Sequence, residues 1–158
     1  MNIPADLLPG DILGFKGEAI VRWKTDGRAG HVAVYVGNNN VVTALTNTGV
    51  GQYPLTIQGT LVWVRRPVGA FNLANAMAWF TKVSGTNYGW DDIEKVADLP
   101  IPLPVSQSND EDMDCSDTCS HFEEAGGTSQ FDPKYDKGSI TPRDFETTIM
   151  SKEIWAAV

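Results

Sequence analysis

Long hydrophobic runs are missing from this sequence, and so are the simplest signs of a membrane protein. No stretch approaches the roughly 18 uninterrupted apolar residues that a membrane-spanning helix needs. The first residues, MNIPAD, also lack the basic region and apolar run of a secretory signal. We therefore expect a chain without a stable membrane anchor that is cytoplasmic as synthesised.

Cysteine and histidine are scarce, with two of each in 158 residues. Cys115 and Cys119 lie four positions apart, so no disulfide framework can be built from them. Together with His31 and His121 they lack the paired ligand spacing of a zinc site. The chain also lacks a phosphate-binding glycine loop. We expect neither a metal nor a cofactor.

Positively charged residues are few: the sequence has 12 Lys and Arg against 20 Asp and Glu, which gives a net charge of −8. This balance argues against nucleic acid as a partner. The negative charge is concentrated in residues 91–124, which hold eleven acids and a single base, Lys95. Two interpretations stay open: a solvated acidic face, or a surface that attracts a positive group on a substrate.

The length fits one domain over residues 1–158, with a β-rich part at 1–68 and a helical part at 72–158. Residues 8–15 predict a turn and a short strand. The apolar runs 31–36 and 41–45, joined by glycine and asparagines, predict a hairpin. Residues 61–67 predict a further strand that ends at a proline.

Helical patterns dominate the second part. Asn72 is the predicted cap of a helix that ends at residue 83. A short helix at about 90–97 and an extended, proline-rich loop to about 114 follow. Further helices are predicted at 115–125 and from Thr141 to about Met150. Strands first and helices later indicate an α+β fold, with a small antiparallel sheet packed on helices.

Cys115 is the candidate nucleophile because it lies in the first turn of a predicted helix, after the capping residue Asp114. Unpaired backbone N–H groups and the helix dipole favour a thiolate at that position. Cys119 lies one turn further along the same apolar stripe and is expected in the core. The helix start therefore predicts which of the two cysteines is reactive.

A thiolate nucleophile usually needs a histidine base. His121 lies on the same helix as Cys115, about 600° further round and about 9 Å along the axis, so it points elsewhere. By elimination the base is His31, at the start of a predicted strand.

Four motifs in the sequence resemble those of a known protein family. Residues 113–126 (MDCSDTCSHFEEAG) resemble the nucleophile helix of the NlpC-type cell-wall peptidases, and residues 30–37 (GHVAVYVG) resemble their histidine strand. Residues 88–90 (YGW) are similar to the aromatic stretch before that helix, and residues 8–12 (LPGDI) to the entry strand. Because His31 precedes Cys115, the order resembles the circularly permuted branch of this papain-like superfamily.

The resemblance implies a papain-like fold and a cysteine peptidase or amidase without cofactor. The family places a polar residue on the next strand, about a hairpin away, to orient the histidine. The matching position here, twelve after His31, is Thr43, with Asn47 as the fallback; the alternative is that Thr43 is an ordinary strand residue. The backbone N–H of Cys115 is the first expected oxyanion donor, with Tyr88 as the second. Tyr88 and Asp114 are the expected oxyanion or substrate side chains.

Peptidoglycan stem peptides are the implied substrate, with an inhibitor or immunity protein as a further partner. Such an enzyme would reach its substrate by a signal-independent route, such as phage or effector secretion. The alternatives are an acyltransferase, thioesterase or lipase on lipid substrates, and a non-catalytic binding module on the same fold.

Overall fold

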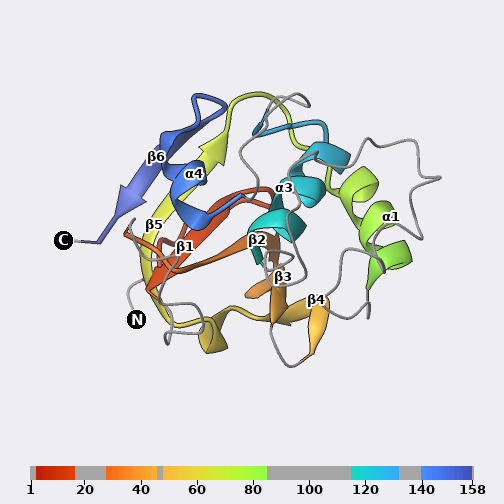
Figure 1. Cartoon of the computed structure of the whole chain (residues 1–158), viewed down its shortest axis with the longest axis horizontal. Coiled ribbons are helices and arrows are strands. Elements are labelled where there is room, and N and C mark those ends of the chain that lie inside the picture. The colour runs from red at the N-terminus through yellow and green to blue at the C-terminus, as the bar shows by residue number, and fades with distance from the viewer. Residues whose placement is uncertain (1–2, 17–27, 46–47, 85–114, 132–139, 158) are drawn as a thin grey trace.

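A single antiparallel sheet organises the chain. The computed structural model describes residues 3–16, 28–45, 48–84, 115–131 and 140–157. These residues form an α+β fold in which six strands lie in the order β4-β3-β2-β1-β5-β6 (Figure 1). The strands are β1 (Ile12–Lys16), β2 (His31–Gly37), β3 (Asn40–Leu45), β4 (Gly49–Pro54), β5 (Thr60–Pro67) and β6 (Ser151–Ala156). The helices are the short 3-10 helix η2 (Leu55–Ile57), α1 (Leu73–Val83), α3 (Cys115–Ala125) and α4 (Pro142–Thr147).

Both faces of the sheet are covered, so its central strands are buried on both sides. Alternate residues of a strand point to opposite faces. Val32 and Val34 therefore pack into one core cluster with α1 and α3, whereas Ala33 packs into a second cluster on the other face with Phe15. This burial explains why β2 is a continuous apolar run rather than an alternating one.

The β2–β3 hairpin is built as the sequence predicts. Gly37, Asn38 and Asn39 all have positive φ (99°, 53° and 59°), a conformation that glycine and asparagine adopt at low cost. The bounds of β1, β2, β3 and β5 agree with the predicted strands to within a few residues.

Helices α1 and α3 lie side by side on one face of the sheet, where α3 contacts β2 and β3 (Figure 1). The Asn72 side chain accepts a hydrogen bond from the N–H of Asn75, so the predicted cap of α1 is confirmed. Helix α3 spans the predicted residues. It is buried on almost every side from Cys115 to Glu123, which makes it the central helix of the fold.

Two strands and one helix end differ from the sequence prediction. Strands β4 and β6 were not predicted, and the last helix ends at Thr147 instead of near Met150. The chain then turns and adds β6 antiparallel to β5, so the C-terminal part is not wholly helical. The predicted helix at 90–97 lies outside the described residues.

The expectation of a solvated acidic face is wrong for two of its eleven acids. Asp117 and Glu123 are both fully buried, and Glu124 is half-buried. Burial raises the pKa of Glu124 to about 7 and that of Glu123 well above its ordinary value. The eight acids at 91–114 lie outside the described residues. Asp117 and Glu123 are therefore unavailable for attracting a substrate.

Candidate functional site

Helix α3 begins at Cys115, as the sequence predicts. The side chain is 4% exposed and belongs to the core cluster that includes Val32 and Phe122. Cys119 lies one turn deeper, fully buried, with its sulfur 3.9 Å from the carbonyl oxygen of Val42. The helix therefore places one cysteine at its N-terminus and the other inside the core.

The sheet divides between β2 and β3 at the point where Cys115 meets it. Strand β2 stays paired with β1 up to His31, and β3 stays paired with β4 up to Leu45. The pairs between β2 and β3, however, begin only at Val34. Residue Val32 therefore faces a gap in the ladder, into which side chains can reach.

Two side chains meet the backbone of Val32 in this gap. Its N–H donates to the Cys115 sulfur over 3.5 Å, and its carbonyl accepts a hydrogen bond of 2.8 Å from the Thr43 hydroxyl. A backbone N–H directed at the sulfur favours the thiolate, as does the helix N-terminus. The gap thus brings the candidate nucleophile to the residue that follows His31.

The His31 ring lies at the start of β2, next to Phe15 of the neighbouring strand. The ring centroids are 5.8 Å apart, and the two residues are cross-strand partners. Burial lowers the pKa of His31, while a hydrogen bond to Gln58 acts in the opposite direction. A ring with a lowered pKa is mainly neutral near pH 7, which suits a base.

Gln58, which no sequence pattern predicted, is the residue whose side chain contacts the imidazole. Its Oε1 lies 2.7 Å from His31 Nε2, and its own Nε2 donates to the Pro54 carbonyl over 3.0 Å. Gln58 follows η2 and lies 27 positions after His31. No spacing rule points to it, because a loop and not a strand register places it there.

Thr43 lies close to this arrangement but makes a different contact from the one predicted. Its hydroxyl donates to the backbone of Val32, whereas the hydrogen bond of the His31 ring goes to Gln58. Among the described residues, a hydrogen bond from the ring to the Cys115 sulfur is not formed. Catalytic hydrogen bonds often tighten only when substrate binds, so the pairing of His31 with Cys115 stays a prediction.

His121 is placed away from the site, in agreement with its phase on α3. It is fully buried and stacks on Trp79 of α1, with ring centroids 5.7 Å apart. Burial lowers the pKa of His121 to about 3. His121 packs against α1, and a pKa of about 3 makes its ring a weak base, so it is poorly suited to take the proton of Cys115.

Three of the named candidates lie outside the described residues: Tyr88, Asp114 and Asn47. Their roles stay predictions. In the part of the chain that is described, no three His, Cys, Asp or Glu side chains gather as a metal site would require.

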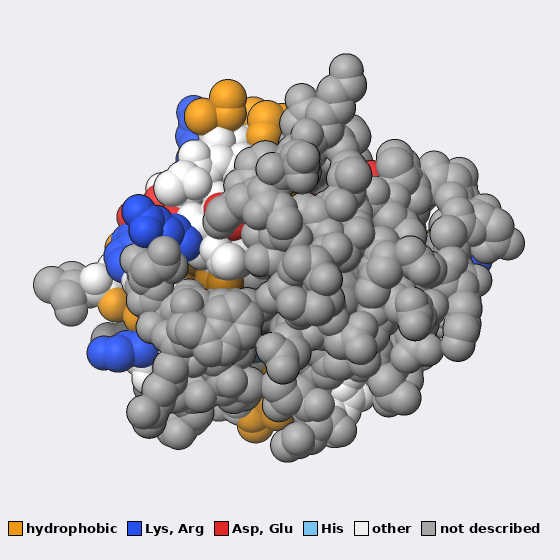
Figure 2. All heavy atoms as spheres, viewed as in Figure 1, with side chains coloured by type: hydrophobic (Ala, Val, Ile, Leu, Met, Phe, Trp, Pro, Cys, Tyr) orange, Lys and Arg blue, Asp and Glu red, His pale blue; other side chains and the backbone are white. Residues whose placement is uncertain are grey.

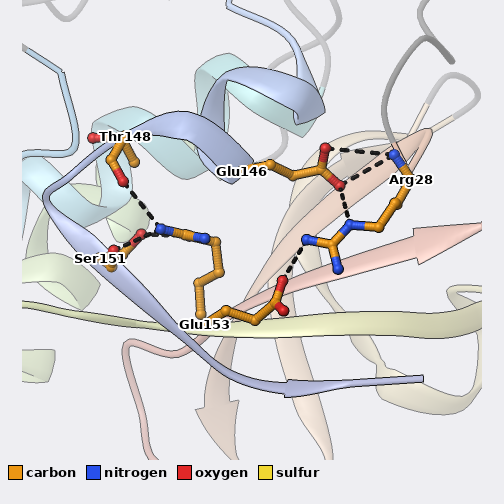
Figure 3. A network of polar contacts seen from close by, with 6 residues as sticks. Arg28, Glu146, Thr148, Ser151 and Glu153 are labelled. Atoms are coloured by element: carbon orange, nitrogen blue, oxygen red, sulfur yellow. Dashed lines mark hydrogen bonds and ion pairs between the residues drawn. The ribbon is translucent and has the colours of Figure 1, made fainter. Parts of the chain in front are cut away.

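The segment that leads into β2 is tied to the far end of the chain (Figure 3). The backbone N–H of Arg28 and its Nε donate to Glu146 of α4, and its guanidinium also pairs with Glu153 of β6. On the other side of the same network, Arg65 donates to Ser151 and to the Thr148 carbonyl. Because Arg28 precedes His31 by three residues, α4 and β6 help to fix where the histidine strand begins.

Comparison with models of known protein families finds no match, and a search of curated proteins finds none either. Among the described residues, no helix has both the length and the apolar character needed to cross a membrane.

Proposed function

We propose that the chain is a cysteine hydrolase with Cys115 as nucleophile and His31 as base, on a circularly permuted papain-like fold of the NlpC type. The observation that carries this proposal is the contact of the Cys115 sulfur with the Val32 N–H. It joins the start of α3 to the start of the histidine strand. A merely buried cysteine, such as Cys119, needs neither a helix N-terminus nor a gap in the sheet.

The reaction would be acyl transfer in two stages. His31 takes the proton of the Cys115 thiol, and the thiolate attacks the carbonyl carbon of an amide. The tetrahedral intermediate collapses to a thioester as the imidazolium gives its proton to the leaving amine. Water, deprotonated by His31, then attacks the thioester, releases the carboxylic acid and restores the thiol.

The oxyanion of the tetrahedral intermediate needs hydrogen-bond donors near the sulfur. The backbone N–H of Cys115, at the first residue of α3, is the first candidate. Tyr88 is the second candidate by resemblance, with Asp114 beside the nucleophile as a substrate residue. An N–H at a helix start carries the favourable dipole as well.

Peptidoglycan stem peptides are the substrate that the family resemblance favours, and an inhibitor or immunity protein would be the corresponding partner. Lipid esters are the second candidate, and one observation favours them. Figure 2 shows hydrophobic side chains at the upper edge of the molecule. Among the exposed large hydrophobic residues, Val68 and Met150 are joined by a backbone hydrogen bond and Ile149 is 88% exposed. An exposed apolar group of this kind is a common feature of lipid-binding surfaces.

The test is incubation with purified peptidoglycan and, separately, with lipid esters, followed by mass spectrometry of the products. We expect new amine and carboxyl ends in the peptidoglycan sample. Cys115→Ala and His31→Ala should abolish them, whereas Cys119→Ser should retain them. Release of fatty acid alone would transfer the proposal to lipids, and the absence of product in both samples would favour a binding module.

A further inference from the structure

We propose that Gln58 is the positioning residue of the site, which holds His31 with the proton on Nε2 and so leaves Nδ1 to accept the proton of Cys115. This role rests on the proposed function for its catalytic meaning. Its structural basis is independent of any substrate.

The hydrogen bonds of Gln58 determine which way its amide group faces. Its NH2 group donates to the Pro54 carbonyl, which can only accept. The amide oxygen is therefore the atom 2.7 Å from His31 Nε2, and it too can only accept. The proton between these two atoms must then belong to the ring, and the neutral imidazole is the Nε2–H tautomer.

The position of Gln58 is itself well fixed. The side chain is 5% exposed, and the backbone N–H donates to the carbonyl of Leu55, the first residue of η2. Phe15 packs beside the same imidazole. With one edge held by the amide and one side lined by Phe15, the ring has little freedom to rotate, and Nδ1 keeps one direction.

An amide and a carboxylate would serve this site differently. A carboxylate at the same place would stabilise the imidazolium through its charge. An amide oxygen orients the ring with a dipole only, so it selects the tautomer without raising the pKa of His31 above its ordinary value. This agrees with the lowered pKa of His31, on which burial has a larger effect than the hydrogen bond to Gln58.

The first experiment measures the tautomer by 15N NMR of the histidine side chains at a pH where both rings are neutral. The chain has two histidines, and His121→Phe assigns the His31 signals. We expect Nε2 protonated and Nδ1 unprotonated in the wild type, and a mixture in Gln58→Met. The matched control is Gln52→Met, the same change on an exposed residue of β4. Nδ1–H in the wild type, or the same tautomer ratio in Gln58→Met, would overturn the proposal.

The second experiment uses Gln58→Glu, which places an acceptor oxygen near Nε2 even if Gln58→Met fails to fold. A carboxylate this close should raise the pKa of His31 by about 1–3 units, measured by NMR titration. The pH profile of Cys115 alkylation by iodoacetamide should shift with it. An unchanged pKa and profile would show that residue 58 does not control the ring.

These readouts need no substrate, so they separate the two proposals. If the tautomer depends on Gln58 but no amide is hydrolysed, the proposed function fails and the positioning of His31 stands. If hydrolysis requires Cys115 and His31 but is unaffected by Gln58→Met and Gln58→Glu, the proposed function is supported and the proposed role of Gln58 is refuted. A true positioning residue should lower kcat by about 10-fold or more when removed, with little effect on KM.

Discussion

Removal of the Thr43 hydroxyl tests the gap between β2 and β3 most directly. Thr43 is fully buried, and its hydroxyl donates to the Val32 carbonyl over 2.8 Å. Valine has the same shape without the hydroxyl. Thr43→Val would leave that buried carbonyl without this donor, which costs about 1–3 kcal/mol. Thr43→Ser keeps the hydroxyl and loses one methyl group, at about 1 kcal/mol.

The test is which of the two variants, Thr43→Val or Thr43→Ser, is the less stable. If the hydrogen bond holds Val32 in place, Thr43→Val should lower the free energy of unfolding more than Thr43→Ser, as measured by urea denaturation. If Thr43 only fills space, the order should be reversed. Equal stability of Thr43→Val and the wild type would refute the importance of the bond.

The same variants separate two roles at the site. If Thr43 acts through Val32, Thr43→Val should slow the alkylation of Cys115, because the Val32 N–H contacts the sulfur. The tautomer of His31 should not change, since Gln58 holds it. In turnover, loss of the hydroxyl in Thr43→Ala should cost about 10- to 100-fold. A changed tautomer in Thr43→Val would instead support the direct contact with the ring that the family pattern predicts.

Three further outcomes follow from burial and charge. Iodoacetamide should label Cys115 before Cys119, as determined by peptide mapping; the reverse order would contradict the proposed nucleophile. His121 has a pKa of about 3 when folded and 6.5 in its ordinary state, so the unfolded chain binds its proton first as the pH falls. Its contribution to the free energy of unfolding should be lost below about pH 6.5, by up to about 1.4 kcal/mol per pH unit. In His121→Phe, the free energy of unfolding measured by urea denaturation should therefore fall less steeply as the pH is lowered. The pKa of Glu123 is raised in the folded protein, so its contribution to stability is present at low pH and is lost as the pH rises through the folded pKa. Glu123→Gln should therefore stabilise the protein more at pH 8 than at pH 4. Equal effects at the two pH values would contradict the burial of Glu123 as a protonated acid.

Local signals in the sequence predicted much of the fold because they act over a few residues. The apolar runs and the Gly37 turn predicted the β2–β3 hairpin, and Asn72 predicted the start of α1. Strand β4 was missed because GVGQYP contains glycines and a proline, which local propensity disfavours in strands. It forms because β3 supplies a hydrogen-bonding edge.

Strand β6 illustrates the same limit at the C-terminus. SKEIWA is mixed in polarity, and several of its side chains are exposed, so no hydrophobic pattern separates it from the helix before it. Pairing with β5 and the contact of Glu153 with Arg28 decide its conformation (Figure 3). Both partners are distant in sequence.

The candidate site divides in the same way. By itself, the sequence determined that Cys115 lies at the start of a helix, that Cys119 lies in the protein core and that His121 points away from Cys115, because helix periodicity relates all three. Only the tertiary structure decided that the Cys115 sulfur meets the Val32 N–H and that Gln58 meets His31. Those contacts join residues 83 and 27 positions apart, and they depend on where the sheet divides and where a short loop ends, neither of which is encoded in local spacing.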